Sequence, residues 1–160
     1  MKRIAPVIVL SAFVVGMFGA AAAASDHFQL SATSKKAAAR QYLSIVAPVN
    51  AAAAKFNDQA NEWSDSTSDA EAEADAEPLI SAVLKLNSKL KVDHWPKSSR
   101  SAIKVLVRVD AALVKALRSL SSVNQTDLSS LFADFQRDQS HLGAAATIVR
   151  HDLGLPPVKD

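Results

Sequence analysis

Four stretches of the chain repeat apolar side chains at the spacing of a helix that buries one face. The first extends from about Ser34 to Trp63. Its apolar positions are Tyr42, Ile45, Val46, Val49, Ala53, Phe56, Ala60 and Trp63. At 3.6 residues per turn these positions share one face of a helix. Pro48 falls off that face, so we expect a kink on the solvent side and not the end of the helix.

The other three stretches are shorter. The second helix is expected from Pro78 to about Lys91, the third from about Pro96 to Leu120, and the fourth from Thr126, as a possible N-cap, to about Asp152. Gly154 followed by Pro156 and Pro157 is a helix stop signal. Because the connections after the second and third helices are short, the pattern predicts an all-α protein, an up-down-up-down four-helix bundle over residues 34–153.

A biased polar segment, SDSTSDAEAEADAE, separates the first two helices and is expected to be an acidic connector over residues 64–77. From Glu62 to Glu77 there are seven acids and no base. Pro78 fits the first position of the following helix, where its missing N–H costs nothing. The alternating acids would diverge on a helix, and they lack the spacing of a calcium loop, so a solvated connector is favoured.

The first 24 residues have the layout of a secretory signal peptide. Lys2 and Arg3 precede an apolar run from Ile4 to about Ala20, and an A-x-A cleavage site is formed by Ala22-Ala23-Ala24. Cleavage is therefore expected between Ala24 and Ser25, followed by an N-terminal tail (25–33). The alternative is an uncleaved membrane anchor, because the apolar run approaches the length of a bilayer span. We expect a secreted or cell-envelope protein with no membrane span in its mature form and a C-terminal tail over 154–160.

Charge and cysteine content narrow the possible functions. The chain has 18 Lys and Arg residues against 16 Asp and Glu residues, but Lys2 and Arg3 lie in the signal peptide, so the mature part is formally neutral. Nucleic-acid binding is therefore not expected. The chain has no cysteine, which excludes disulfides, thiol chemistry, zinc-thiolate sites and a lipid-modified cysteine.

One acid interrupts an apolar stripe. Asp110 falls in the middle of the face formed by Ile103, Leu106, Val107, Leu113, Val114 and Leu117. A buried carboxylate is tolerable when it is hydrogen-bonded, and the register of the expected bundle makes Asn50 and Gln139 candidate partners. We interpret Asp110 as a structural contact that sets helix register. The alternative, a general acid or base, would need a second group of matching role, and none falls in the same stripe at that level.

Candidate metal and haem ligands are incomplete. Asp138-x-x-His141, with Asp134 one turn earlier, resembles half of a di-iron bundle site, but the motif occurs once, and a solvated rim is favoured. Met1 and Met17 lie in the signal peptide, and the four histidines, at 27, 94, 141 and 151, fall near helix ends or on flanks. We therefore expect no catalytic, cofactor-binding or metal-binding residue, and no cofactor.

The segment from Lys85 to Arg118 is rich in positive charge. It contains nine Lys and Arg residues and only two acids, Asp93 and Asp110. Such a region could bind the acidic connector, anionic lipid or a wall polymer. The bases are scattered around two helices, so an ordinary solvated surface is the favoured interpretation. Trp63 and Trp95 are expected at opposite ends of the bundle, each closing the edge of the core.

Three stretches together resemble small exported proteins and lipoproteins of mycobacteria and related actinobacteria, largely of unknown function. They are QYLSIVAPVNAAAAKFN (41–57), WPKSSRSAIKVLVRVDAALVKAL (95–117) and FQRDQSHLGAAATIVRHDLGLPP (135–157). The resemblance implies export and a helical fold, and it assigns no catalytic residue. Those relatives often carry a lipid-attachment cysteine after the signal, which this chain lacks.

These features predict a non-enzymatic binding or interaction module of the cell envelope or extracellular space, whose partner is a protein or an envelope component. The alternative is a carrier of a small apolar ligand, with Pro48 and the small residues Ala53, Gly143 and Ala146 leaving room between helices. An enzyme that uses Asp110 is the third possibility.

Overall fold

The computed structural model describes residues 29–64, 66–92, 95–119 and 143–156, and the regular structure in these ranges is entirely helical. The helices are α1 (Gln29–Asn61), α2 (Asp69–Val92), the short 3-10 helix η1 (Lys97–Ser99), α3 (Arg100–Arg118) and a further helix over residues 143–152. No strand occurs in the described ranges, so the predicted all-α class is confirmed.

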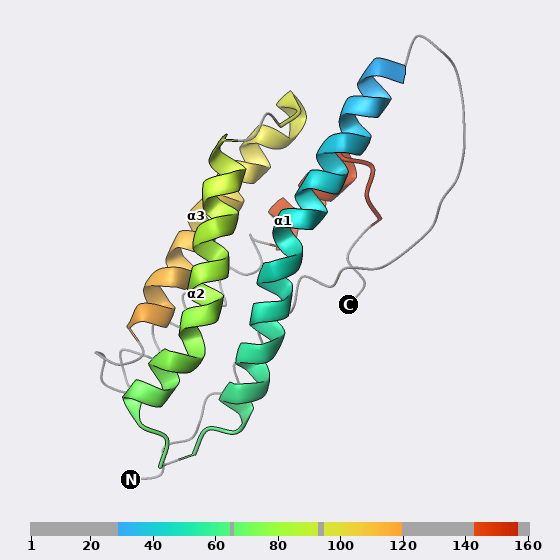
Figure 1. The fold of residues 1–160 in the computed structure, drawn as a ribbon. Helices are drawn as coiled ribbons and strands as arrows, with labels where there is room; N and C mark the ends of the chain where they lie inside the picture. Colours follow the sequence, from blue (N-terminus) through green and yellow to red (C-terminus); the bar gives the residue numbers. More distant parts are fainter. Residues whose placement is uncertain (1–28, 65, 93–94, 120–142, 157–160) are drawn as a thin grey trace.

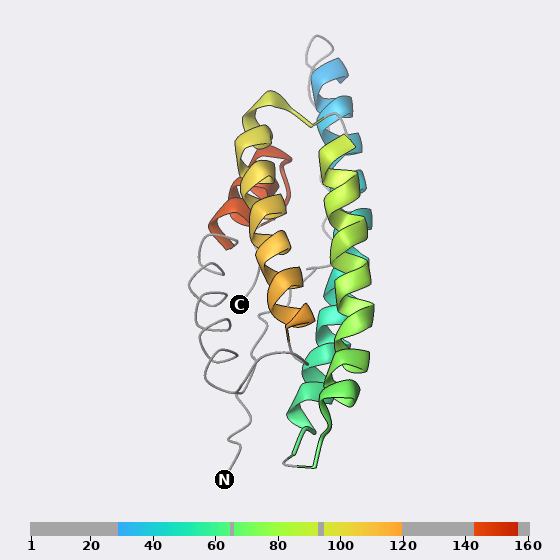
Figure 2. The ribbon, with the colours of Figure 1, turned by 90° about the vertical axis from the view of Figure 1, so that its left-hand side faces the viewer.

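The first three long helices lie side by side (Figure 1). α1 and α2 are joined by a short connection and run in opposite directions, and α3 returns along α2. The helix over 143–152 packs near the first turns of α3 (Figure 2). A hydrogen bond from Ser99 Oγ to Asp152 Oδ2, 3.3 Å long, joins these two segments.

Helix α2 begins nine residues earlier than the sequence predicted, so the expected connector over 64–77 is wrong beyond Ser68. The cause is a capping box. The Ser68 backbone N–H donates to Glu71 Oε2 at 2.7 Å, and the Glu71 N–H donates back to Ser68 Oγ at 3.2 Å. These bonds satisfy two N–H groups that the first turn leaves unpaired. The Ser68 backbone N–H and the Ser68 hydroxyl both donate to the Glu71 carboxylate, and these two bonds hold the pKa of that carboxyl below its usual range.

Both internal prolines lie inside helices that continue through them. Pro48 lies within α1 as expected, whereas Pro78 lies within α2 and not at its first position. Both rings are exposed. On the solvent side, water can reach the carbonyl that the missing N–H leaves unpaired, so the proline is tolerated there.

The predicted boundary at the N-terminus also shifts, because α1 begins at Gln29, inside the stretch expected to be a tail over 25–33. Residues 29–34 contain neither glycine nor proline, and nothing in their sequence ends the helix. The signal peptide and its cleavage site at Ala24 and Ser25 lie outside the described residues. So do the first turns of the predicted fourth helix, since residues 120–142 are not described.

Asp75 joins α1 to α2 near their connection. Its carboxylate accepts a hydrogen bond from Trp63 Nε1 at 2.9 Å and another from Gln59 Nε2. The Trp63 ring meets the Phe56 ring edge-on, with centroids 5.6 Å apart. The acidic stretch was expected to be solvated, but Asp75 is half-buried and anchors the start of α2.

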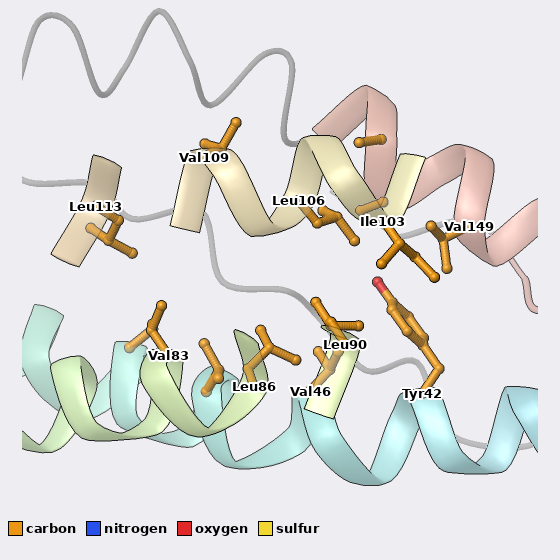
Figure 3. Packing of buried hydrophobic residues seen from close by; sticks show 14 of the residues in the cluster. Tyr42, Val46, Val83, Leu86, Leu90, Ile103, Leu106, Val109, Leu113 and Val149 are labelled. Atoms are coloured by element: carbon orange, nitrogen blue, oxygen red, sulfur yellow. The ribbon is translucent and has the colours of Figure 1, made fainter. Parts of the chain in front are cut away.

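The core lies along the inner faces of α1, α2, α3 and the helix over 143–152. Figure 3 shows Leu106 and Leu113 of α3 pointing toward Val83, Leu86 and Leu90 of α2. The largest fully buried side chains are Tyr42, Phe56, Leu79, Ile80, Leu90 and Leu117. At the end opposite Trp63, Trp95 packs edge-on against Tyr42, with ring centroids 6.3 Å apart. The predicted placement of the two tryptophans at opposite ends of the core is therefore confirmed.

The C-terminal helix ends in a Schellman turn. Gly154 has a φ of 70°, its N–H donates to the His151 carbonyl, and the Leu155 N–H donates to the Arg150 carbonyl at 2.8 Å. This left-handed conformation is open to glycine without steric cost. The predicted stop signal is confirmed. None of the described helices is long and apolar enough to cross a membrane.

Candidate functional site

Asp110 is buried in the core, as its position in the apolar stripe predicted, with 3% of its surface exposed. Within the described part of the chain, its Oδ2 atom has no hydrogen-bond partner. The predicted bond to Asn50 is wrong, because both amide atoms of Asn50 are buried and have no partner among the described residues, Asp110 included. The other predicted partner, Gln139, lies outside the described residues.

A second buried polar side chain lies on α2, which packs against α3. Asn87 is buried, and its Oδ1 has no hydrogen-bond partner among the described residues. A buried oxygen acceptor without a donor is destabilising.

The electrostatics favour a protonated Asp110. Burial raises the pKa of the Asp110 carboxyl from 3.8 to about 7. Burial also raises the pKa of the Tyr42 hydroxyl to about 12, an effect that the positive charge of Arg150 opposes and the charge of Asp110 reinforces. The charges of Asp110 on α3 and Arg150 on the C-terminal helix therefore both act on the hydroxyl of Tyr42 on α1.

Arg150 is a charged group that sequence reasoning missed. Its side chain is only 5% exposed, and its Nε donates to the Pro156 carbonyl at 2.8 Å, which holds the C-terminal turn against the helix. Arg150 and Asp110 are not joined as an ion pair. The sequence contains a pattern that predicts this burial. Ala146, Val149, Arg150 and Leu153 recur at helical spacing and share one face, as the residues around Asp110 do.

A carboxyl with a pKa near 7 has the acidity of a general acid or base. Catalysis also requires that a substrate reach the group, and Asp110 is not among the residues that line the surface groove described next. The described chain also holds no cluster of three or more metal-ligating side chains. Asp134, Asp138, His141, His27 and His94 all lie outside the described residues.

A groove of about 550 Å³ lies between the end of α2 and the start of α3. It is lined by Leu90, Lys91, Val92, Trp95, Arg100, Ile103, Lys104 and Val107. Among these described residues three are basic and none is acidic. Val92 is 69% exposed and adds apolar surface to the groove. Apolar surface with a few polar groups at its edge is typical of ligand-binding sites.

The groove is built on the α2–α3 turn. Trp95 Nε1 donates to the Leu90 carbonyl at 2.9 Å, which closes the end of α2. Arg100 Nε in turn donates to the Trp95 carbonyl at 3.1 Å. The sequence marked this region as basic, but it did not predict that three of the nine bases share one hollow. Their sequence spacing alone does not reveal it, because the two helices must first be packed together.

Comparison with protein-family models, with curated proteins and with solved structures finds no match to this chain.

Proposed function

We propose that this protein is an exported, non-enzymatic binding module of the cell envelope or extracellular space, and that the groove between α2 and α3 is its binding site. The mature protein is then a four-helix bundle of up-down-up-down topology that begins at Ser25. The proposal takes export from the signal-like pattern of residues 1–24 and from the resemblance to exported actinobacterial proteins.

The observation that carries the proposal is the chemistry of the groove. Ile103 and Trp95 are buried core residues whose side chains also form the floor of a surface hollow. Lys91, Arg100 and Lys104 add positive charge at that hollow. A ligand from an envelope rich in anionic lipids and polymers is electrostatically suited to it.

The alternative function, a carrier with its ligand between the helices, draws less support from the small residues. Ala53 and Ala146 are buried members of the packed core. Gly143 is exposed, with no atom within 4 Å of the position a side chain would take, so it makes no room inside the bundle. The groove at the surface favours the binding module.

The test begins with the protein recovered from its own host. We expect the culture fluid or envelope fraction to contain a chain whose denatured mass begins at Ser25, and native mass spectrometry to reveal bound material in part of the sample. A full-length chain held only in membranes would contradict export in the cleaved form. Material that stays bound when the groove residues are substituted would support the carrier instead.

The groove is tested with the double substitution Val92→Asp and Lys104→Glu. It places negative charge at two exposed positions of the groove, one of them apolar and one basic in the parent. We expect this variant to keep its helical circular dichroism and to lose the bound material or the envelope association. Lys55→Glu, an exposed position on α1 outside the groove, serves as the control and should change neither. Unchanged association in the groove variant would refute the groove as the binding site.

A further inference from the structure

The groove combines two kinds of surface that few ligands match together. The apolar lining residues are Leu90, Val92, Trp95, Ile103 and Val107. The basic lining residues are Lys91, Arg100 and Lys104. A neutral hydrocarbon would leave the cations without a partner, and a polar polyanion would leave the carbon surface exposed to water. A molecule that matches both has a hydrocarbon chain and a negatively charged head.

The position of Arg100 indicates where the head would bind. Its Nε is already used in the hydrogen bond to the Trp95 carbonyl, which fixes the guanidinium against the α2–α3 turn. Its two terminal nitrogens make no hydrogen bond within the part of the chain that the structure describes. That edge of a guanidinium fits the two oxygens of a carboxylate in a bidentate pair. Lys104, one turn further along α3, lies close enough in sequence to add a second charge on the same side.

The position of Trp95 indicates where the chain would lie. The indole is 5% exposed, and its N–H is bonded to the Leu90 carbonyl, so it presents carbon to the groove. Ile103 and Val107 follow one another by a turn on α3 and extend this carbon surface. A volume of about 550 Å³ falls within the range of small-molecule sites.

We propose that the groove binds a single-chain fatty acid, with its carboxylate on Arg100 and Lys104 and its alkyl chain across Trp95, Ile103 and Val107. This inference rests on the proposed function and names the ligand class of the same site. The binding is reversible and involves no covalent step.

The test is a titration of the nitrogen-15-labelled exported protein with sodium dodecanoate below its micelle concentration. The chain has two tryptophans, so its spectrum contains two indole N–H signals, and Trp63 at the opposite end of the core is an internal control. We expect the Trp95 signal to shift and the Trp63 signal to stay. Dodecanol, the uncharged match, should bind at least about tenfold more weakly, because it lacks the charge-assisted hydrogen bonds.

Three variants measure how much individual basic side chains contribute to dodecanoate binding. Lys104→Gln should weaken dodecanoate binding several-fold and leave dodecanol binding unchanged. Arg100→Lys keeps the positive charge and removes the guanidinium group that pairs with both carboxylate oxygens, so it should also weaken dodecanoate binding. Arg108→Gln removes an equal charge from an exposed position on α3 outside the groove, and should have no effect. Because Lys104 makes no side-chain hydrogen bond to the described residues of the α2–α3 turn, its variant is not expected to disturb the groove itself.

Several outcomes would overturn the inference. Equal binding of dodecanol would refute the role of the cations, and tighter binding of dodecyl phosphate would refute the carboxylate. If envelope material shifts the Trp95 signal and dodecanoate does not, the fatty-acid assignment fails while the proposed function stands. If neither dodecanoate nor envelope material shifts it, both fail.

Discussion

At the scale of single residues, Asp110 and Arg150 are buried charges on two different helices that do not neutralise each other as a pair. Asp110 has an oxygen without a hydrogen-bond partner in the described ranges, and Arg150 donates to the carbonyl of Pro156. An isolated carboxylate in a core is costly, so the group takes up a proton instead. The molecule therefore contains a carboxyl that changes its charge near neutral pH.

The first prediction concerns the pH dependence of stability. The folded-state pKa of Asp110 is raised to about 7 from 3.8, so between these values the folded state binds more protons than the unfolded state. The free energy of unfolding should therefore fall as pH rises from below 4 to above 7, by an amount of the order of 4 kcal/mol at about 1.36 kcal/mol per pKa unit.

The variant Asp110→Asn keeps the shape of the side chain and removes its charge. We expect its urea denaturation midpoint to match that of the parent at pH 4 and to exceed it at pH 8. Since other groups also titrate, the quantity to compare is the difference between the two proteins at each pH. A variant that loses stability at pH 8 would show that the charged form of Asp110 is needed in the core.

At the scale of elements, the start of α2 shows how a few hydrogen bonds decide where a helix begins. The Ser-x-x-Glu motif at 68–71 was present in the sequence, but the acidic composition and Pro78 pointed to a later start. The capping box stabilises the earlier start. Asp75 then accepts hydrogen bonds from Gln59 of α1 and from Trp63, which lies just after α1. An exposed proline inside the helix does not prevent this.

The second prediction tests this cap. Ser68→Ala removes the side chain that accepts the Glu71 N–H, and we expect a loss of about 1 kcal/mol in the free energy of unfolding. Ser88→Ala is the matched control, because Ser88 lies exposed within α2 and its hydroxyl bonds only the Lys85 carbonyl of its own helix. That control should be neutral or slightly stabilising. Equal losses in the two variants would contradict a specific cap.

At the scale of the whole molecule, the C-terminal helix completes the core rather than forming an appendage. Val149 is fully buried and lies near Ile103 and Tyr42 (Figure 3). The bond between Ser99 and Asp152 fixes this helix against the start of α3. Ile103 lines the groove and also belongs to the core that includes Val149. The groove therefore depends on the C-terminal helix being in place.

The third prediction follows from that packing. Val149→Ala should lower the free energy of unfolding by about 1–3 kcal/mol, because it removes buried methyl groups and leaves a cavity. Ile148→Ala, at the neighbouring half-exposed position, should change it by no more than about 0.5 kcal/mol. Chemical denaturation of both variants at one pH provides the comparison. Similar effects at the two positions would mean that the helix does not pack as described.

The periodic apolar pattern determined a large part of this molecule. It predicted the helical class, the stripe on α1 with Pro48 outside it, the burial of Asp110, the places of the two tryptophans and the stop at Gly154. These features are local, because the repeat of a helix fixes which side chains share a face and which residues can end it.

Tertiary structure alone decided the rest. Whether buried Asp110 meets Asn50 depends on the rotation and register of separate helices, which a stripe does not specify, and there the prediction was wrong. The groove depends on how the end of α2 packs against the start of α3, since Lys91 and Lys104 share one hollow only after the turn at Trp95 is formed. Helical periodicity constrains each helix by itself, whereas a site between helices arises from their packing.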